Sequence, residues 1–154
     1  MGLVFLVDCS ASSSLLHVHT ALDIMDTYPD DIECSVYYFN QYCDCLVFKK
    51  KKRYISFQYL MHEFHSHGST ALYDAVCSVL KSHSWWDKVY IITDNAGDTS
   101  SKTFTKDDMK SSLAWRPFTY IVKVDTETQE LGGTPGCLAH SQTTIFDSAI
   151  LDEV

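Results

Sequence analysis

A short apolar run that ends in an acid constrains this chain more than any other feature. Residues 3–7 (Leu-Val-Phe-Leu-Val) contain no polar side chain, and Asp8 follows them directly, with Ser10 and Ser12 at alternate positions after it. Such a run predicts a strand that is buried on both faces, as in parallel sheets. In open α/β sheets, ligands bind beyond the carboxyl ends of these strands. We therefore expect Asp8, Ser10 and Ser12 at a ligand-binding edge.

Two later segments add similar side chains. Residues 88–93 form a second apolar run, and Asp94 follows it. Between the two runs, Gly68 and Thr70 precede a segment with apolar residues at three- and four-residue spacing, which predicts a helix. All the polar side chains at these run ends supply hard oxygen atoms, and such atoms suit magnesium, manganese or calcium.

The order of these residues resembles the von Willebrand factor A family with its metal-ion-dependent adhesion site. The matching pattern is Asp-x-Ser-x-Ser, then Gly-Ser-Thr-x-Leu, then Thr-Asp. The resemblance implies that Ser10, Ser12 and Thr70 contact Mg²⁺ (or Mn²⁺) directly. It implies that Asp8 and Asp94 mainly hold coordinating waters. One coordination position would stay open for an Asp or Glu carboxylate of a protein partner, so the site would bind without cleaving bonds.

The strand and helix patterns predict a single domain over residues 1–154. We expect a three-layer α/β/α fold with a mainly parallel central sheet and one antiparallel edge strand. The expected strands are 3–7, 33–40, 43–48, 88–93 and 118–124, with a short last strand at 143–146, and the expected helices are 15–26, 57–64, 70–80 and 106–115. The resemblance covers roughly residues 3–125. The family's usual terminal helix is expected to be short or missing.

Composition limits the partners and the compartment. The formal net charge is -8, which argues against nonspecific nucleic-acid binding and against an anionic membrane surface. No stretch approaches the roughly 20 apolar residues of a membrane span. The start of the chain has no signal-peptide pattern, so we expect an intracellular protein, cytoplasmic or nuclear, whose six cysteines are reduced thiols.

Alternatives to the metal site stay open at this stage. Acids and hydroxyls at strand ends also cap helices and form turns. A magnesium-dependent phosphoryl or ester hydrolase would use Asp8 and Asp94, but it would need a nucleophile or general base that the sequence does not identify. A third alternative is a scaffold of the same fold that binds partners without metal. One departure from the family pattern is Asn95, where a glycine is common, with Gly97 two residues later.

Several other side chains invite a functional interpretation. A zinc site from His62 and His65 with Cys43 and Cys45 is a weaker interpretation than solvated histidines, because nothing in the sequence brings the pairs together. The basic run 49–53 is a localisation signal, a phosphate contact, a docking patch or, as we favour, a solvated hairpin end.

For the remaining residues we expect structural roles. His17 and His19 are expected near the exposed side of the first helix, and the three tryptophans in or at the border of the core. Asp98 is either an outer-shell acid or an exposed loop acid, and Asp74 is expected to be a plain surface acid.

Overall fold

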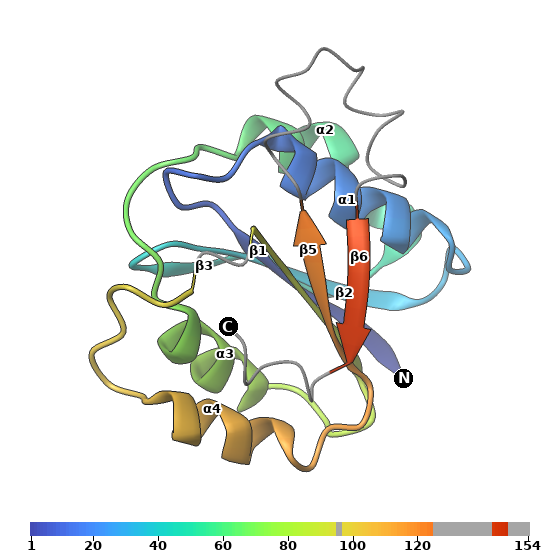
Figure 1. Cartoon of the computed structure of the whole chain (residues 1–154). Coiled ribbons are helices and arrows are strands. Elements are labelled where there is room, and N and C mark those ends of the chain that lie inside the picture. Colours follow the sequence, from blue (N-terminus) through green and yellow to red (C-terminus); the bar gives the residue numbers. More distant parts are fainter. Residues whose placement is uncertain (95–96, 125–142, 148–154) are drawn as a thin grey trace.

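A six-stranded sheet runs through the computed structural model, which describes residues 1–94 and 97–124 and the strand 143–147 (Figure 1). The spatial order is β3-β2-β1-β4-β5-β6. The bounds are β1 Gly2–Asp8, β2 Glu33–Phe39, β3 Cys43–Lys51, β4 Lys88–Thr93, β5 Thr119–Val124 and β6 Thr143–Asp147. Strands β2, β1, β4 and β5 are mutually parallel, and β3 is antiparallel to β2 at one edge. The predicted architecture is confirmed.

The opposite edge differs in one respect from the prediction. Strand β6 also pairs in an antiparallel sense, with β5, so the sheet has two antiparallel edge strands rather than one. The short strand predicted at residues 143–146 is thus present. Asn95, the loop around 131–136, Cys137 and the chain after 147, where the short or missing terminal helix was expected, lie outside the described residues.

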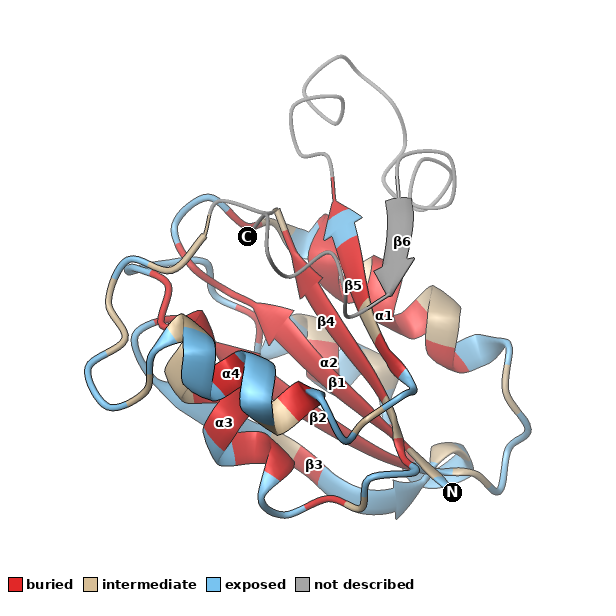
Figure 2. Ribbon diagram, turned by 60° about the horizontal axis from the view of Figure 1, so that its bottom comes forward, coloured by how far each residue is buried: buried red, intermediate tan, exposed pale blue. Residues whose placement is uncertain are grey.

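Helices cover both faces of the sheet. Helices α1 (Leu15–Asp26) and α2 (Phe57–His62) pack on one face, and α3 (Leu72–Leu80) and α4 (Lys106–Leu113) pack on the other (Figure 1). In β1, Leu3, Phe5 and Val7 enter the first core, while Val4 and Leu6 enter the second. This two-sided burial explains the uninterrupted apolar run, because residues 3–8 of β1 are all buried (Figure 2).

The helix starts follow from capping chemistry. Ser14 caps α1 by accepting a hydrogen bond from the Leu16 N–H, and His17 Nδ1 accepts from the Ser14 N–H to complete a reciprocal box. Thr105 and Asp108 form the same arrangement at the start of α4. The hydroxyl cluster after Ser12 therefore begins a helix, as its composition predicts.

The prediction of a solvated hairpin end for the basic run is confirmed, whereas the prediction that the tryptophans lie in or at the border of the core was wrong. Lys49, Lys50 and Lys51 are the exposed last residues of strand β3, at the open end of the β2–β3 hairpin, and a short 3-10 helix, η1 (Lys52–Tyr54), follows. The tryptophans are exposed surface residues; Trp115 has 81% of its area in solvent, and Trp85 packs edge-on against Trp86.

Within the part of the chain that is described, no helix is long and apolar enough to span a membrane.

Candidate functional site

The carboxyl ends of β1 and β4 lie side by side, at the point where the strand order changes direction. Val7 pairs with Ile92, which places Asp8 beside Thr93. The Asp8 side chain is fully buried, and it accepts hydrogen bonds from the Ser10 N–H at 2.8 Å and from Thr93 Oγ1 at 3.2 Å. Asp8 therefore lies at a switch point of the kind where open α/β sheets bind ligands.

The two serines after Asp8 lie close together. Ser10 Oγ and Ser12 Oγ are 3.4 Å apart; Ser10 is buried and Ser12 is exposed. That separation is longer than a good O–H···O hydrogen bond. It is close to the roughly 3 Å that separates adjacent oxygens around an octahedral Mg²⁺ with bonds of about 2.1 Å.

The loop that carries Thr70 is joined to the serine loop through the backbone. The Ala11 N–H donates to Gly68 O at 2.9 Å, and the His67 N–H donates to Cys9 O at 2.9 Å. Thr70 is buried, and its N–H donates to Thr99 Oγ1 at 3.0 Å. The structure therefore brings the Thr70 loop next to the Asp8 loop, although the two lie far apart in sequence.

His17 connects the two acids electrostatically. Its imidazole is fully buried, and burial lowers its pKa, whereas Asp8 and Asp94 act in the opposite direction. The negative charges of the two acids therefore favour the protonated ring, but burial is the stronger effect. Asp94 itself follows β4 directly and is half-buried.

The buried position of His17 contradicts the prediction that it faces solvent. Because Nδ1 accepts the Ser14 N–H, the ring proton is on Nε2. Nε2 is buried and has no hydrogen-bond partner among the described residues. A buried donor without a partner is costly, so a water or ligand in the acidic site would satisfy it. His17 is thus a candidate site residue that sequence reasoning missed.

The described side chains fit a hydrated divalent cation. They bring two carboxylates, closely spaced hydroxyls and an unsatisfied N–H donor to one edge of the sheet. Within residues 1–94 and 97–124, no three His, Cys, Asp or Glu side chains gather as a metal site. A set of two acids and three hydroxyls is a different kind of site, and its metal occupancy stays a prediction.

Asp98 organises the loop after β4. It accepts from the Tyr73 N–H at 2.9 Å and from the Ser100 and Ser101 N–H groups, and it is half-buried. Tyr73 lies in the first turn of α3, which has no side-chain cap of its own. Asp98 therefore caps this helix from a distant loop, and it is not the exposed acid that the sequence suggested as one alternative.

Asp74 anchors the next part of the same loop, contrary to the prediction of a plain surface acid. Its carboxylate accepts from the N–H groups of Lys102, Thr103 and Phe104 at 2.8 to 3.1 Å. Burial alone would raise the pKa of Asp74, but these backbone donors and the Lys102 charge outweigh it and hold the pKa below its ordinary value of 3.8.

This arrangement predicts a pH-dependent loss of stability in Asp74→Asn. A depressed pKa in the folded state contributes stability above the ordinary value, and this contribution is lost as the pH falls through the folded pKa. We expect Asp74→Asn to be less stable than the wild type at neutral pH, with the difference shrinking below about pH 4. Urea unfolding across this range measures it, and a difference that is constant with pH would contradict the assignment.

Gly68 is favoured by a left-handed backbone, and the flexible side chain of Gln41 also comes close to it. Its φ is +80°, and an added Cβ would lie 2.0 Å from Gln41 Oε1, the atom that accepts from the Ser69 N–H. Gly97 also has a positive φ, +85°, but open space surrounds it.

These two glycines form a matched pair for mutation. Gly97→Ala should lower the free energy of unfolding by about 1 kcal/mol, because only the left-handed backbone opposes the alanine. Gly68→Ala meets the same cost and must also displace Gln41, so we expect a loss of about 2 kcal/mol. Urea unfolding of both variants measures this, and equal losses would show that the contact with Gln41 is unimportant.

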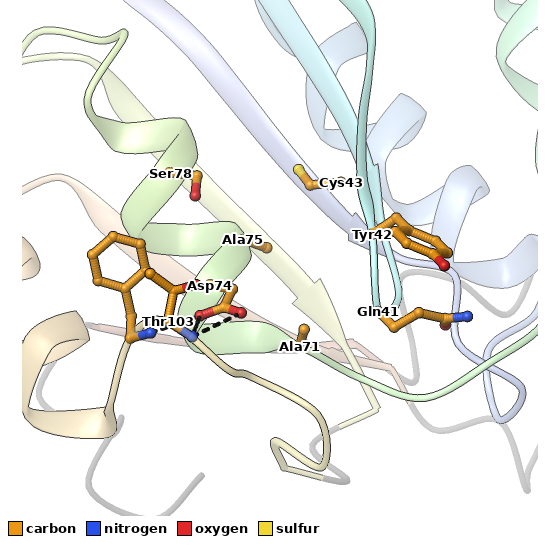
Figure 3. A pocket seen from close by; sticks show the side chains of 9 residues that line it. Gln41, Tyr42, Cys43, Ala71, Asp74, Ala75, Ser78 and Thr103 are labelled. Carbon is orange, nitrogen blue, oxygen red and sulfur yellow. Dashed lines mark hydrogen bonds between the residues drawn. The ribbon is translucent and has the colours of Figure 1, made fainter.

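A cavity of about 240 Å³ borders the site (Figure 3). Gln41, Tyr42 and Cys43 line one side, and residues of α3 with Thr103 and Phe104 line the other. Ala71, which directly follows Thr70, is part of the lining. The cavity therefore offers room for a side chain next to the candidate metal position.

The other predicted constellations do not assemble. His62 and His65 are exposed and join no metal-binding group among the described residues, so a zinc site there has no support. Burial, reinforced by Asp8, raises the pKa of the Cys9 thiol to about 12. Cys9 is therefore a buried thiol and a poor nucleophile. Cys43 and Cys45 are exposed free thiols.

Comparison with solved structures places the fold. The chain is similar to a von Willebrand factor type A protein from Catenulispora acidiphila (TM-score 0.60, 14% identity, 77% of this chain and 31% of that one). It is also similar to proximal thread matrix protein 1 from the mussel byssus, with a TM-score of 0.61, 16% identity, and coverage of 80% of this chain and 35% of that one. A third similar structure is the conserved hypothetical protein BatB from Bacteroides thetaiotaomicron, with a TM-score of 0.56, 14% identity, and coverage of 79% of this chain and 64% of that one.

These likenesses show a von Willebrand factor A-like fold, as the sequence predicts. The chain spans about a third of the length of the first two structures and less than two thirds of the third. No protein-family model matches the chain, and no curated protein has a similar sequence.

Proposed function

We propose that this von Willebrand factor A-like domain is a protein-interaction module that captures a partner carboxylate through Mg²⁺ or Mn²⁺. The single observation that carries the proposal is the convergence of Asp8, the serine loop and the Thr70 loop at the β1–β4 switch point. The fold supports the general role of interaction module, and the donor set supports the metal.

The residues of the proposed site have different roles in holding the ion. Ser10, Ser12 and Thr70 present hydroxyl oxygens to the ion, while Asp8 and Asp94 supply negative charge and hold its waters. His17 donates its Nε2–H to one of these waters, which would satisfy its unpaired buried donor. The bound cation supplies an electrophilic position at which a carboxylate oxygen can bind.

A partner's neighbouring side chain has a place to bind. The cavity beside Ala71 adjoins the Thr70 loop, so a residue adjacent to the captured Asp or Glu would enter it. The affinity of an ion-mediated contact alone is modest, and an apolar anchor next to it would add specificity.

Manganese binding tests the metal step directly. Electron paramagnetic resonance measures free Mn²⁺, and we expect its signal to fall when the wild-type chain is added. Thr70→Ala should bind Mn²⁺ much more weakly, because it removes a ligand. Thr103→Ala is the matched control, since its hydroxyl lies in the same neighbourhood but outside the ligand set. No binding by the wild type would refute the metal.

Carboxylate capture needs a second measurement. A fluorescent peptide that carries one aspartate between glycines should bind the Mn²⁺-loaded protein, and chelation with EDTA should release it. A peptide with asparagine in place of aspartate is the control. Equal binding of the two peptides would refute carboxylate capture even if the metal binds.

Two alternative functions, a hydrolase and a metal-free scaffold, predict different experimental results. A magnesium-dependent hydrolase would turn over a generic phosphoester such as p-nitrophenyl phosphate, and Cys9, with its raised pKa, offers it no activated nucleophile. A metal-free scaffold would show the same thermal unfolding with and without Mg²⁺.

A further inference from the structure

A second recess lies between the edge strand β3 and the start of α2. It has a volume of about 530 Å³. The residues that line it are Leu46, Val47, Phe48, Lys50, Tyr54, Ile55, Ser56 and Tyr59, and we call them the β3 groove. Val47 and Ile55 are buried and make an apolar floor, while Tyr54 and Tyr59 are 64% and 45% exposed at the rim. This volume suits one large apolar side chain with part of its backbone.

Positive charge is concentrated beside this groove. Five of the 12 Lys and Arg residues lie at positions 49–53, in a chain of net charge -8. Lys52 is used inside the fold, at 3.6 Å from Asp26 Oδ1 and 3.5 Å from Asp30 Oδ1. The other four cations are exposed, and one of them, Lys50, lines the groove itself.

The edge of β3 is irregular, which favours groove binding over the addition of a strand. The β2–β3 register shifts twice, between Cys34 and Val36 and between Val36 and Tyr37. Lys49 has a positive φ of 49°, which disrupts the extended backbone where the basic run begins. Such irregularities discourage pairing with an incoming strand, so recognition would depend on side chains.

We propose that the β3 groove binds an acidic segment of a partner protein, with a Leu or Phe side chain on the apolar floor. The segment's Asp or Glu residues would pair with Lys50, which lines the groove, and with Arg53, which is exposed and directly precedes the lining residue Tyr54. This surface is separate from the metal site and does not depend on it. It goes beyond the proposed metal-mediated contact by adding a second, charge-selected one.

The acidic residues around the groove favour a short acidic peptide over a longer polyanion as the ligand. Glu33 pairs across the ladder with Lys51, and Asp44 is an exposed acid on the same strand as the lysines. A nucleic acid or an anionic bilayer would extend over these acids and the rest of a negatively charged surface. A short peptide needs to reach only the exposed cations.

A labelled peptide tests this proposal. The probe is a fluorescein-labelled octapeptide of glutamates around a central Phe-Leu pair, titrated into the full chain in EDTA, so that the metal site does not contribute. We expect saturable binding that weakens with added salt. Lys50→Glu should raise Kd about tenfold or more, a change of about 1.4 kcal/mol. Tyr54→Ser should also weaken binding, because it removes part of the rim.

Matched controls make the test specific. Lys123→Glu causes the same change of charge at an exposed site on β5 and should leave Kd unchanged. A peptide of glutamates alone should bind more weakly than the probe. Equal affinity of Lys50→Glu and the wild type would overturn the proposal. Tighter binding of single-stranded oligothymidine or of phosphatidylserine vesicles than of the peptide would also overturn it. Binding that persists in Asp8→Asn would support it, whatever the outcome for the metal site.

Discussion

Asp8→Asn is expected to abolish the stabilisation of this protein by Mg²⁺. A ligand present at 100 times its Kd stabilises the folded state by about 2.7 kcal/mol, which corresponds to a rise of roughly 5–10 °C in Tm for a chain of this size. The wild type should show this rise. The variant should not, because it removes one of the two carboxylates near the ion.

The same substitution should have a different effect without metal. The asparagine side chain of the variant can keep the hydrogen bond from the Ser10 N–H and can donate to Thr93 Oγ1, so the local structure is preserved. It also removes a buried charge that forms no ion pair with any residue the structure describes. In EDTA we therefore expect Asp8→Asn to be as stable as the wild type or more stable.

Thermal unfolding in Mg²⁺ and in EDTA measures both effects. Asp31→Asn is the matched control, since this exposed acid lies outside the site and should retain the full Mg²⁺ shift. An equal Mg²⁺ shift in Asp8→Asn and the wild type would contradict the proposed site. A large loss of stability in EDTA would instead assign Asp8 a mainly structural role.

Arg116→Leu is expected to cause the largest loss of stability among the polar substitutions considered. The guanidinium donates to Leu80 O at 2.6 Å, to His83 O at 2.8 Å and to Ser84 O at 2.9 Å. These carbonyls belong to the end of α3 and the turn after it, where a positive charge also complements the helix dipole. Removing three charge-assisted hydrogen bonds should cost about 2–4 kcal/mol.

Urea unfolding provides the measurement for this prediction. We expect a lower midpoint with an unchanged m-value, because the loss concerns stability rather than compactness. Arg116→Lys should recover only part of the loss, since an ammonium lacks the planar fork. Arg53→Leu makes the same change at an exposed site and should cost less than about 0.5 kcal/mol. A similarly small cost at Arg116 would show that water replaces its bonds.

Local patterns in the sequence were sufficient to locate the oxygen-bearing residues. Asp8 and Asp94 follow apolar runs, and the edge of a parallel sheet follows from such runs because central strands are buried on both faces. The Ser14 cap and the start of α1 also follow from short-range chemistry. Each of these features depends on residues within a few positions of one another.

Other residues acquire their roles only from contacts between distant segments. A histidine in an amphipathic helix usually faces water, but α1 buries His17 completely, and the charges of Asp8 and Asp94 act on its pKa. Asp98 caps a helix that begins 26 residues earlier, at Leu72, and no nearby sequence pattern predicts this cap. The antiparallel direction of β6 likewise depends on how the chain returns to β5.

The sequence by itself thus determined the buried strands, the two-sided core and the residues available for a metal site. Only the tertiary structure decided that the serine loop and the Thr70 loop are joined, that His17 Nε2 is a buried donor, and that the basic run borders an apolar groove. The physical reason is that hydrophobic periodicity records which face of an element is buried, whereas polar partners are selected by pairings across the sheet.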